Sequence, residues 1–224
     1  MRRQAGFTVV ELLVVIAIIA ILASAAVPRF AFARREANES AAIATLRNLV
    51  TAQQTLQTMG VVDVDRDGEG EHAFLAEIAG SAPVRGTTTV LEPPSFSRAF
   101  GAIQLSRASR SSYLFQVFLP AMDGRGVAED PNGGKALASA VDPDLAEIFW
   151  CAYAWPANRE PGNMKVFFAN QTGEILAAGN EIARYDGDEL RPRYDAAFLD
   201  SESMIGLAAV NAVGRDGETW RLAR

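Results

Sequence analysis

The chain has very few of the residues that build metal centres and nucleophilic active sites. Its 224 residues include one cysteine, Cys151, and one histidine, His72. A single cysteine cannot form an intramolecular disulfide, and zinc sites need several nitrogen or thiolate ligands. A Ser-His-Asp triad would have to use His72, which follows a run of acidic residues. The composition therefore argues against a disulfide scaffold, a zinc site and a serine hydrolase. Cys151 lies in the apolar run 148–155, so we expect a small core residue and not a reactive thiol.

Positive charge is also scarce. The 21 Lys and Arg residues against 27 Asp and Glu residues give a formal net charge of −6 and a pI near 4.9. Nucleic acids are bound through basic patches, so no nucleic-acid partner is favoured. The sequence Gly-Gly-Lys at 133–135 lacks the earlier glycine of a phosphate loop and is followed by Ala136. No other motif supports catalysis, and we expect a protein that is not an enzyme.

The long apolar run near the N-terminus is the most informative feature that is present. It extends from Phe7 to Val27, contains Glu11 as its one charged residue, and ends at Pro28. At 1.5 Å per residue these residues form a helix roughly 31 Å long, enough to cross a bilayer core. An ionised carboxylate inside such a span is costly and usually marks function.

This N-terminal segment resembles the prepilin-type leader shared by type IV pilins and type II secretion pseudopilins. The matching features are a short basic leader at 1–6, a Gly6/Phe7 junction, Glu11 at the fifth position after the junction, the apolar run, and Pro28 at the twenty-second. The close resemblance covers about the first 60 residues. It implies that a membrane peptidase, the prepilin peptidase, cleaves between Gly6 and Phe7 and methylates the new amine of Phe7.

The resemblance also implies a role for Glu11 in assembly. In a filament, Glu11 would pair with the Phe7 amine of a neighbouring subunit in a core of low dielectric constant. Removing one partner from a buried ion pair typically costs about 3–5 kcal/mol. The implied partners are the prepilin peptidase, an inner-membrane assembly platform, and other subunits of a homo-oligomeric or mixed pilin filament.

We expect a single-pass inner-membrane precursor with its head outside the cytoplasm, and then a periplasmic pseudopilus or a cell-surface filament. Arginines flank the apolar run on both sides, so charge alone does not fix the orientation; the short leader fits an N-terminus inside the cell. Two alternatives stay open. One is a secretory signal cleaved after Ala25, although a discarded segment gains nothing from Glu11. The other is a plain membrane anchor.

One helix is predicted from Phe7 to Met59, roughly 80 Å long. Residues 31–59 are rich in good helix formers. Their apolar residues recur at helical spacing and form one stripe: Ile43, Leu46, Leu49, Val50 and Leu56. We expect Pro28 to kink or locally melt the helix and Gly60 to end it. The predicted organisation is a leader (1–6), a transmembrane and assembly helix (7–27), an amphipathic extension (28–59) and a globular head (60–224).

The head is predicted to contain an antiparallel sheet. Strands are expected at 111–119, 149–155, 164–170, 174–178 and 219–222, with a short helix at 72–79. The amphipathic helix would cover one face of the sheet, so the fold class is α+β: a long N-terminal helix packed on an antiparallel head, as in pilins. Aromatic residues of the strands could form a ligand platform, but we expect them in the core: Tyr113, Phe115, Trp150, Tyr153 and Trp155.

An acidic segment directly follows the helix and predicts a calcium loop. Asp63, Asp65 and Asp67 take the first, third and fifth positions of an EF-hand loop, and Gly68 follows at the turn. The twelfth position is Phe74 where an EF-hand has a bidentate Glu, so this is not an EF-hand. Glu69, Glu71 or a residue distant in sequence could complete the ligand shell. The alternative is a solvated acidic turn, with only Arg66 within it to offset the five acids.

These observations favour a structural subunit of a type IV pilus-like filament or of a type II secretion pseudopilus. Many pilins have a disulfide in their C-terminal region, and this chain, with one cysteine, cannot form it. The missing disulfide and the acidic loop slightly favour a pseudopilin. The alternative is a secreted or membrane-anchored calcium-dependent binding module.

Overall fold

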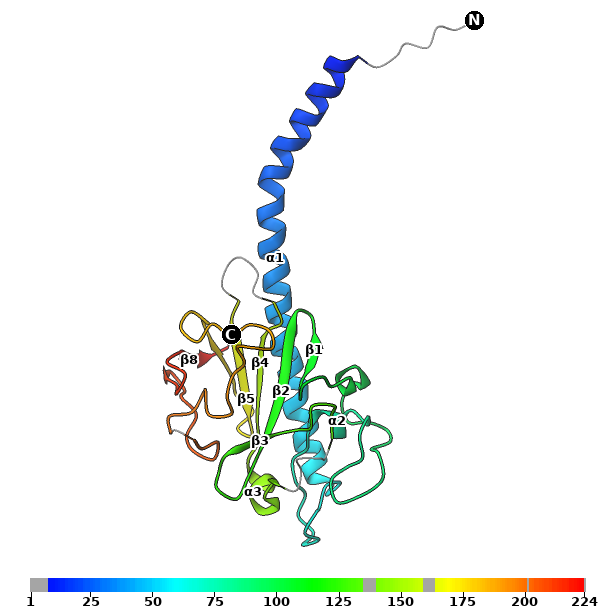
Figure 1. Cartoon of the computed structure of the whole chain (residues 1–224), viewed down its shortest axis with the longest axis vertical. Helices are drawn as coiled ribbons and strands as arrows, with labels where there is room; N and C mark the ends of the chain where they lie inside the picture. The colour runs from blue at the N-terminus through cyan, green and yellow to red at the C-terminus, as the bar shows by residue number, and fades with distance from the viewer. Residues whose placement is uncertain (1–7, 135–139, 159–163, 201, 224) are drawn as a thin grey trace, which may run out of the picture. The chain divides into compact units, whose positions relative to one another are not determined.

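The computed structural model describes residues 8–134, 140–158, 164–200 and 202–223. Helix α1 runs from Val9 to Thr58 (Figure 1), and it confirms the long helix that the sequence predicts. Gly60 follows with a φ of 60°, the left-handed conformation that commonly ends a helix. The helix continues through Pro28, so the backbone is not melted there; a kink at this residue stays a prediction.

The chain divides into two compact units, residues 1–38 and 39–224. In the first unit every side chain from Thr8 to Arg34 is exposed. This part of α1 includes a stretch long and apolar enough, by length and composition alone, to cross a membrane. The second unit contains the rest of α1 together with the head, because α1 residues from Ala42 onward supply part of the head's core.

The head is built on an eight-stranded sheet in the order β1-β2-β4-β5-β6-β8-β7, with β3 paired to the end of β2. Every pairing is antiparallel. The strands are β1 Ala108–Arg110, β2 Tyr113–Pro120, β3 Gly126–Ala128, β4 Cys151–Pro156, β5 Val166–Asn170, β6 Ile175–Ala178, β7 Ala212–Val213 and β8 Thr219–Leu222. The five predicted strands are confirmed as β2, β4, β5, β6 and β8, whereas the short β1, β3 and β7 were not predicted.

Three short helices complete the head: α2 Leu75–Ile78, the 3₁₀ helix η1 Arg98–Gly101, and α3 Pro143–Ile148. Helix α2 is shorter than the predicted 72–79 because the backbone at Phe74 is extended, with ψ 163°, so the helix begins only at Leu75. The His72 N–H donates to Ala146 O, and the Ala73 N–H donates to the Gln53 side chain. Helix α3 begins at Pro143 after Asp142, whose carboxylate accepts the Leu145 N–H at 3.0 Å.

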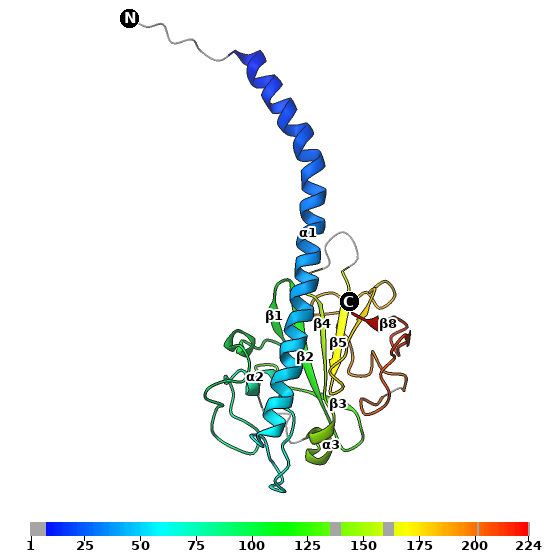
Figure 2. The same ribbon diagram turned by 180° about the vertical axis from the view of Figure 1, so that it is seen from behind.

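One face of the sheet packs on the second half of α1. Side chains alternate along each strand, and Tyr113, Phe115, Ala152 and Phe167 belong to the core that α1 shares. Three leucines of α1 are buried in the same core: Leu46, Leu49 and Leu56. Figure 2 shows the second half of α1 lying across this face of the sheet. The predicted amphipathic stripe is therefore the covering layer of the sheet.

The other face of the sheet is covered by the C-terminal segment, a layer that the sequence did not predict. Phe118, Tyr153 and Phe168 alternate onto this face and pack with Phe198 and Trp220. The Tyr153 hydroxyl donates to Tyr194 O and accepts the Ala197 N–H, each at 3.0 Å. Because both faces are covered, all residues of β2, β4 and β5 are buried.

Cys151 and the strand aromatics are core residues. Cys151 is fully buried in β4, and burial raises the pKa of its thiol well above the usual range. All five aromatic residues considered as a ligand platform are buried. The interpretation of these side chains as packing residues is confirmed.

Candidate functional site

Glu11 lies in the first turn of α1 and caps the start of the helix. One carboxylate oxygen, Oε2, accepts the Thr8 N–H and the Thr8 hydroxyl, each at 2.8 Å. In return the Thr8 hydroxyl oxygen accepts the Glu11 N–H at 3.2 Å. This is a capping box, in which a Thr and a Glu three residues later satisfy each other's backbone donors. The sequence Thr-Val-Val-Glu carries that signature, and our prediction for Glu11 did not use it.

The geometry around Glu11 is compatible with a pairing to the amine of a neighbouring subunit, the role that the resemblance implies. Glu11 is exposed, and so are the apolar residues of the helix that follow it. Thr8 occupies one carboxylate oxygen, and the other is available to a cation from outside the chain. The cleavage residues Gly6 and Phe7 lie outside the described residues, so the pairing of Glu11 with a Phe7 amine stays a prediction.

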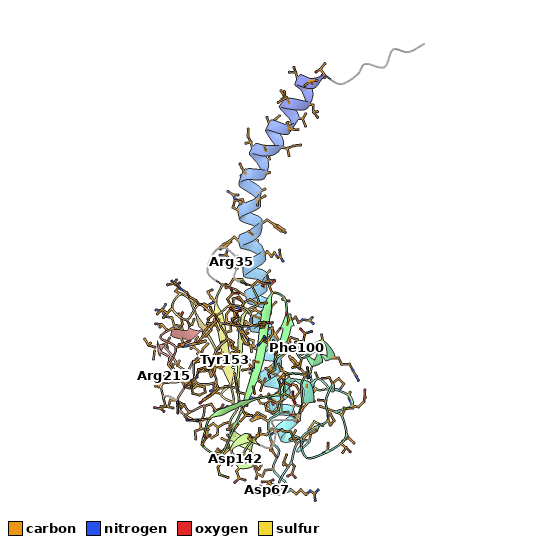
Figure 3. The ribbon with its side chains drawn as sticks, in the orientation of Figure 1. Arg35, Asp67, Phe100, Asp142, Tyr153 and Arg215 are labelled. Carbon is orange, nitrogen blue, oxygen red and sulfur yellow. The ribbon has the colours of Figure 1, made fainter. Side chains whose placement is uncertain are left out.

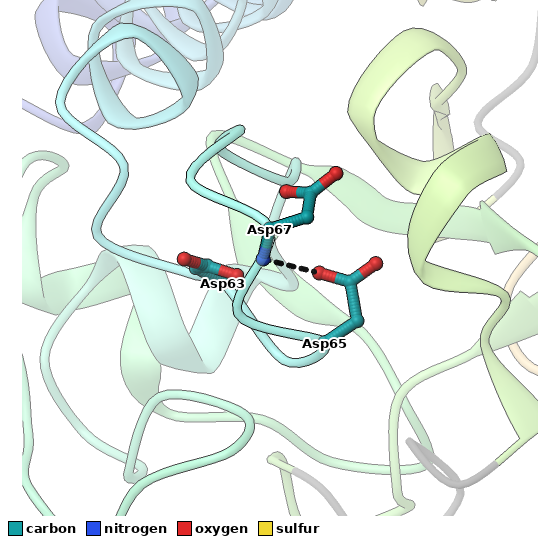
Figure 4. A group of neighbouring side chains, drawn as sticks. All are labelled: Asp63, Asp65 and Asp67. Atoms are coloured by element: carbon teal, nitrogen blue, oxygen red, sulfur yellow. Dashed lines mark hydrogen bonds between the residues drawn. The ribbon is translucent and has the colours of Figure 1, made fainter.

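The acidic loop brings three carboxylates together. Ligand oxygens of Asp63, Asp65 and Asp67 lie within 4.8 Å of one another (Figure 4). Calcium–oxygen distances of 2.3–2.6 Å place two ligands of one ion at most about 5 Å apart, so the spacing suits a single ion. Two of these carboxylates also accept backbone N–H groups of the same loop and stabilise its turns. Asp63 accepts the Arg66 N–H at 2.6 Å, and Asp67 accepts the Glu69 N–H at 2.8 Å.

Helix α3 adds two carboxylates to this group from a distant part of the sequence. Oxygens of Asp65, Asp144 and Glu147 also lie within 4.8 Å of one another. Glu147 Oε1 is buried and has no hydrogen-bond partner among the described residues. Desolvation first, and the charges of Asp67, Glu69, Asp65 and Asp144 in addition, raise the pKa of Glu147. Figure 3 shows Asp67 and Asp142, which caps α3, at the same end of the head.

Glu69 and Glu71 do not join the converging group. Glu69 is exposed, and its side chain is outside both sets of converging oxygens. Glu71 is turned into the core: its Oε1 accepts the Val64 N–H at 2.7 Å, and its Oε2 lies 3.1 Å from Arg85 Nη1. The carboxylates that converge with Asp65 from elsewhere in the chain are those of Asp144 and Glu147, not those of Glu69 and Glu71. Sequence reasoning did not single out Asp144 or Glu147.

Arg85 connects the acidic loop to the core of the head. Its side chain is 2% exposed and lies between Glu71 and Glu77, the latter at 3.3 Å. It also donates to His72 O and lies over the Phe74 ring. Burial raises the pKa of both Glu71 and Glu77, and the Arg85 charge opposes that shift. The cation thus neutralises carboxylates that would otherwise be buried without compensation.

His72 does not lie in a catalytic arrangement within the described structure. It is buried beside Trp150, with ring centroids 5.9 Å apart. Burial, above all, lowers its pKa to about 4, so the imidazole is neutral near pH 7. Its Nδ1 has no hydrogen-bond partner among the described residues, and none of the converging carboxylate groups includes it.

The comparisons with known proteins concern the N-terminal part of the chain. Residues 1–27 match the family model described as the prokaryotic N-terminal methylation motif. The chain is 47% identical over 57 residues to a protein named type IV wide pilus major component PilA4, from Thermus thermophilus. This match covers 25% of the chain and 44% of the relative, so the chain spans less than half the length of the curated relative it matches. No solved structure matches the chain.

Proposed function

We propose that the chain is a member of the type IV pilin family and a structural subunit of a helical filament; its support is the N-terminal methylation motif and the similarity to a type IV pilus component. In this proposal the prepilin peptidase cleaves between Gly6 and Phe7 and methylates Phe7. The mature chain is then held in the inner membrane with its head outside the cytoplasm. It enters the filament through α1, and Glu11 pairs with the Phe7 amine of a neighbouring subunit.

The observation that carries this proposal is the combination of the N-terminal methylation motif with an apolar first half of α1 that no described residue covers. The motif spans residues 1–27, and every described side chain from Thr8 to Arg34 is exposed. Apolar surface gains about 25 cal/mol per Å² when it leaves water. A helix of this composition therefore needs a bilayer first, and neighbouring helices once it has left the bilayer.

We favour a type IV pilus-like filament over a secretion pseudopilus. The relative with the similar N-terminal segment is named as a major component of a type IV pilus. A pseudopilus is supported only by the missing disulfide and the acidic loop, both of which suit either machine. The partners in this proposal are the prepilin peptidase, the inner-membrane assembly platform, and further pilin subunits.

Mass spectrometry of the protein from its native membrane tests the proposal. We expect an intact mass and an N-terminal peptide that begin at N-methylated Phe7. A chain that begins after Ala25 would show an ordinary secreted protein, and an uncleaved chain would show a plain membrane anchor. Either result would contradict a filament subunit.

We also propose that the head binds calcium at the acidic loop. The specific support is the convergence of Asp63, Asp65 and Asp67 with Asp144 and Glu147 from α3. Hard oxygen ligands of this kind suit calcium. Glu147 would supply the carboxylate ligand that an EF-hand loop has at its twelfth position and that this loop, with Phe74 there, lacks. This second proposal is compatible with a filament subunit, and it is also the basis of the alternative function, a calcium-dependent binding module.

Isothermal titration of the full chain in detergent with calcium tests this site. We expect binding at or below millimolar calcium, and its loss in Asp65→Asn, because Asp65 belongs to both converging groups. Glu92→Gln is the matched control, since Glu92 is an exposed acid that pairs with Arg98. Absence of heat with the unaltered chain at millimolar calcium, or equal heat in the Asp65 variant, would remove the calcium proposal.

A further inference from the structure

A hollow on the head combines an apolar lining with uncompensated acids. It has a volume of about 420 Å³ and lies between the turn that follows β5 and the part of the C-terminal segment at residues 205–210. Phe149 and the buried Phe168 line it. Leu207, which is 74% exposed, and Val210 form part of its edge. Large apolar side chains left this exposed around a hollow indicate a binding surface.

The charges around this hollow are all negative. Glu174 and Asp200 are its charged lining residues. Both are exposed, and neither forms an ion pair within the described part of the chain. In two of the other hollows on the head the charged lining residues are arginines alone, Arg110 in one and Arg191 with Arg193 in the other. In a third hollow the lining combines three arginines with four acids. An apolar segment that carries a positive charge therefore suits the acidic hollow, which is the one of these four without a basic lining residue.

The chain contains such a segment just beyond the apolar run of α1. Val27, Phe30 and Arg34 are spaced by three and four residues, so they lie on one face of the helix. All three are exposed, and Phe30 is 72% exposed. Phe30 and Arg34 follow Pro28, outside the stretch expected to cross the hydrocarbon core. Arg34 forms no ion pair with any described residue.

We propose that the acidic hollow receives the Phe30–Arg34 face of α1 from a second copy of this chain. Phe30 enters the apolar hollow, and Arg34 pairs with Asp200 or Glu174 at its edge. This is the helix-in-groove mode of recognition, with an apolar anchor and a charge that fixes the register. The inference rests on the proposed filament function.

The proposed contact also suits a filament geometrically. It joins two different surfaces of the same chain, one on the head and one on α1. A contact between unlike surfaces does not pair two copies and stop; unless the rotation closes a ring, it continues into an open helical assembly. A helix face alone, meeting its own copy, would give a closed dimer.

Cysteine cross-linking in filaments made by the full chain tests the contact. The double variant Phe30→Cys/Leu207→Cys should give a ladder of covalent oligomers with a short thiol cross-linker. Cys151 stays unreactive because it is fully buried. The matched control is Phe30→Cys/Leu105→Cys, because Leu105 is also exposed but borders a hollow lined by arginines. Equal ladders in both variants, or cross-links confined within single chains, would overturn the proposal.

Charge reversal gives a second readout. Asp200→Arg and Arg34→Asp should each lower filament yield by roughly tenfold, and the two together should restore it, because close interfacial charge pairs couple strongly. Circular dichroism checks that each variant is folded. If filaments form in normal amounts in both single variants, this contact is wrong while the filament function stands. If the unaltered chain forms no filament, the function itself has failed.

Discussion

The two halves of helix α1 share one continuous backbone but lie in opposite environments. From Thr8 to Arg34 every side chain is exposed. From Ala42 onward, Leu46, Leu49 and Leu56 are buried in the core of the head. In proteins most helix stability comes from the packing of an apolar face and not from propensity. The comparison therefore shows which half of α1 the head stabilises by packing and which half the described residues leave exposed.

Each region also holds one ionisable group of particular interest, Glu11 in the first and Arg85 in the second. Glu11 stands at the start of the exposed half, and apart from its capping partner Thr8 it has no polar contact in the described structure. Arg85 stands inside the head, between Glu71 and Glu77. In the proposed filament the first group takes a partner from outside the chain, whereas the second has its partners within the fold. Changes at the two sites should therefore separate assembly from folding.

The largest effect is expected for Glu11→Ala. This change removes the carboxylate that would pair with the neighbouring Phe7 amine, and loss of one partner from a desolvated pair costs about 3–5 kcal/mol at each interface. Electron microscopy should find no filaments, while the thermal unfolding of the head stays unchanged. Glu11→Gln separates the two roles of this residue, because glutamine keeps an acceptor for Thr8 but has no charge. Filaments in the Gln variant would show that capping, and not ion pairing, is what assembly needs.

Arg85→Met should cause the largest loss of stability in the head. The change leaves Glu71 and Glu77 buried without their cation, and the cost of breaking a buried pair is about 3–5 kcal/mol. Chemical denaturation of the full chain in detergent measures it. Arg98→Met is the matched control, since Arg98 pairs with Glu92 on the surface and exposed pairs contribute little. Equal stability of the two variants would mean that Arg85 does not fasten the acidic loop to the core.

A pair of leucine substitutions compares the two halves of α1 directly. Leu46→Ala removes a side chain that is fully buried in the head and should lower the free energy of unfolding by roughly 2–5 kcal/mol. Leu13→Ala removes the same atoms from an exposed position and should leave the head unchanged. Denaturation of both variants in detergent tests this, and a similar loss in the two would show that the first half of α1 also packs on the head.

Several parts of the fold could be predicted because their signals are local. The strands β2, β4, β5 and β6 are rich in aromatic and branched residues bounded by turn residues, and α1 follows from composition and spacing. Two further signals were present but unused: Thr8 before Glu11 as a capping box, and Asp142 before Pro143 as the start of α3. The short strands β1, β3 and β7 carry too few residues to show a period.

Other features depend on contacts between distant residues and have no local signal. The C-terminal segment covers the second face of the sheet through irregular loops that place Phe198 against Phe168 of β5. Glu71 resembles the other acids of its loop in sequence, yet Arg85 draws it into the core. Glu147 joins the acidic group only because α3 packs at that end of the head. Such placements are set by the whole fold.

The smallest effect is expected from Glu129, which is fully buried in the head. It accepts the Ala76 N–H at 3.2 Å and the Gly134 N–H at 3.4 Å, and burial raises its pKa to about 8. An acid with a raised pKa in the folded state contributes stability that is present below its unfolded pKa of about 4.5 and is lost as the pH rises towards 8. Between pH 6.5 and pH 8 the loss should be about 1–2 kcal/mol.

This pH window isolates Glu129 from His72. The lowered pKa of His72, about 4, has the opposite sign, because its contribution is present above pH 6.5 and is lost as the pH falls through 4. Thermal unfolding between pH 6.5 and pH 8 should therefore show a decline that Glu129→Gln reduces, since glutamine keeps the acceptor without titrating. Glu71 and Glu77 shift in the same direction as Glu129 and account for any decline that remains. An unchanged slope in the Gln variant would show that Glu129 is already ionised in the folded head.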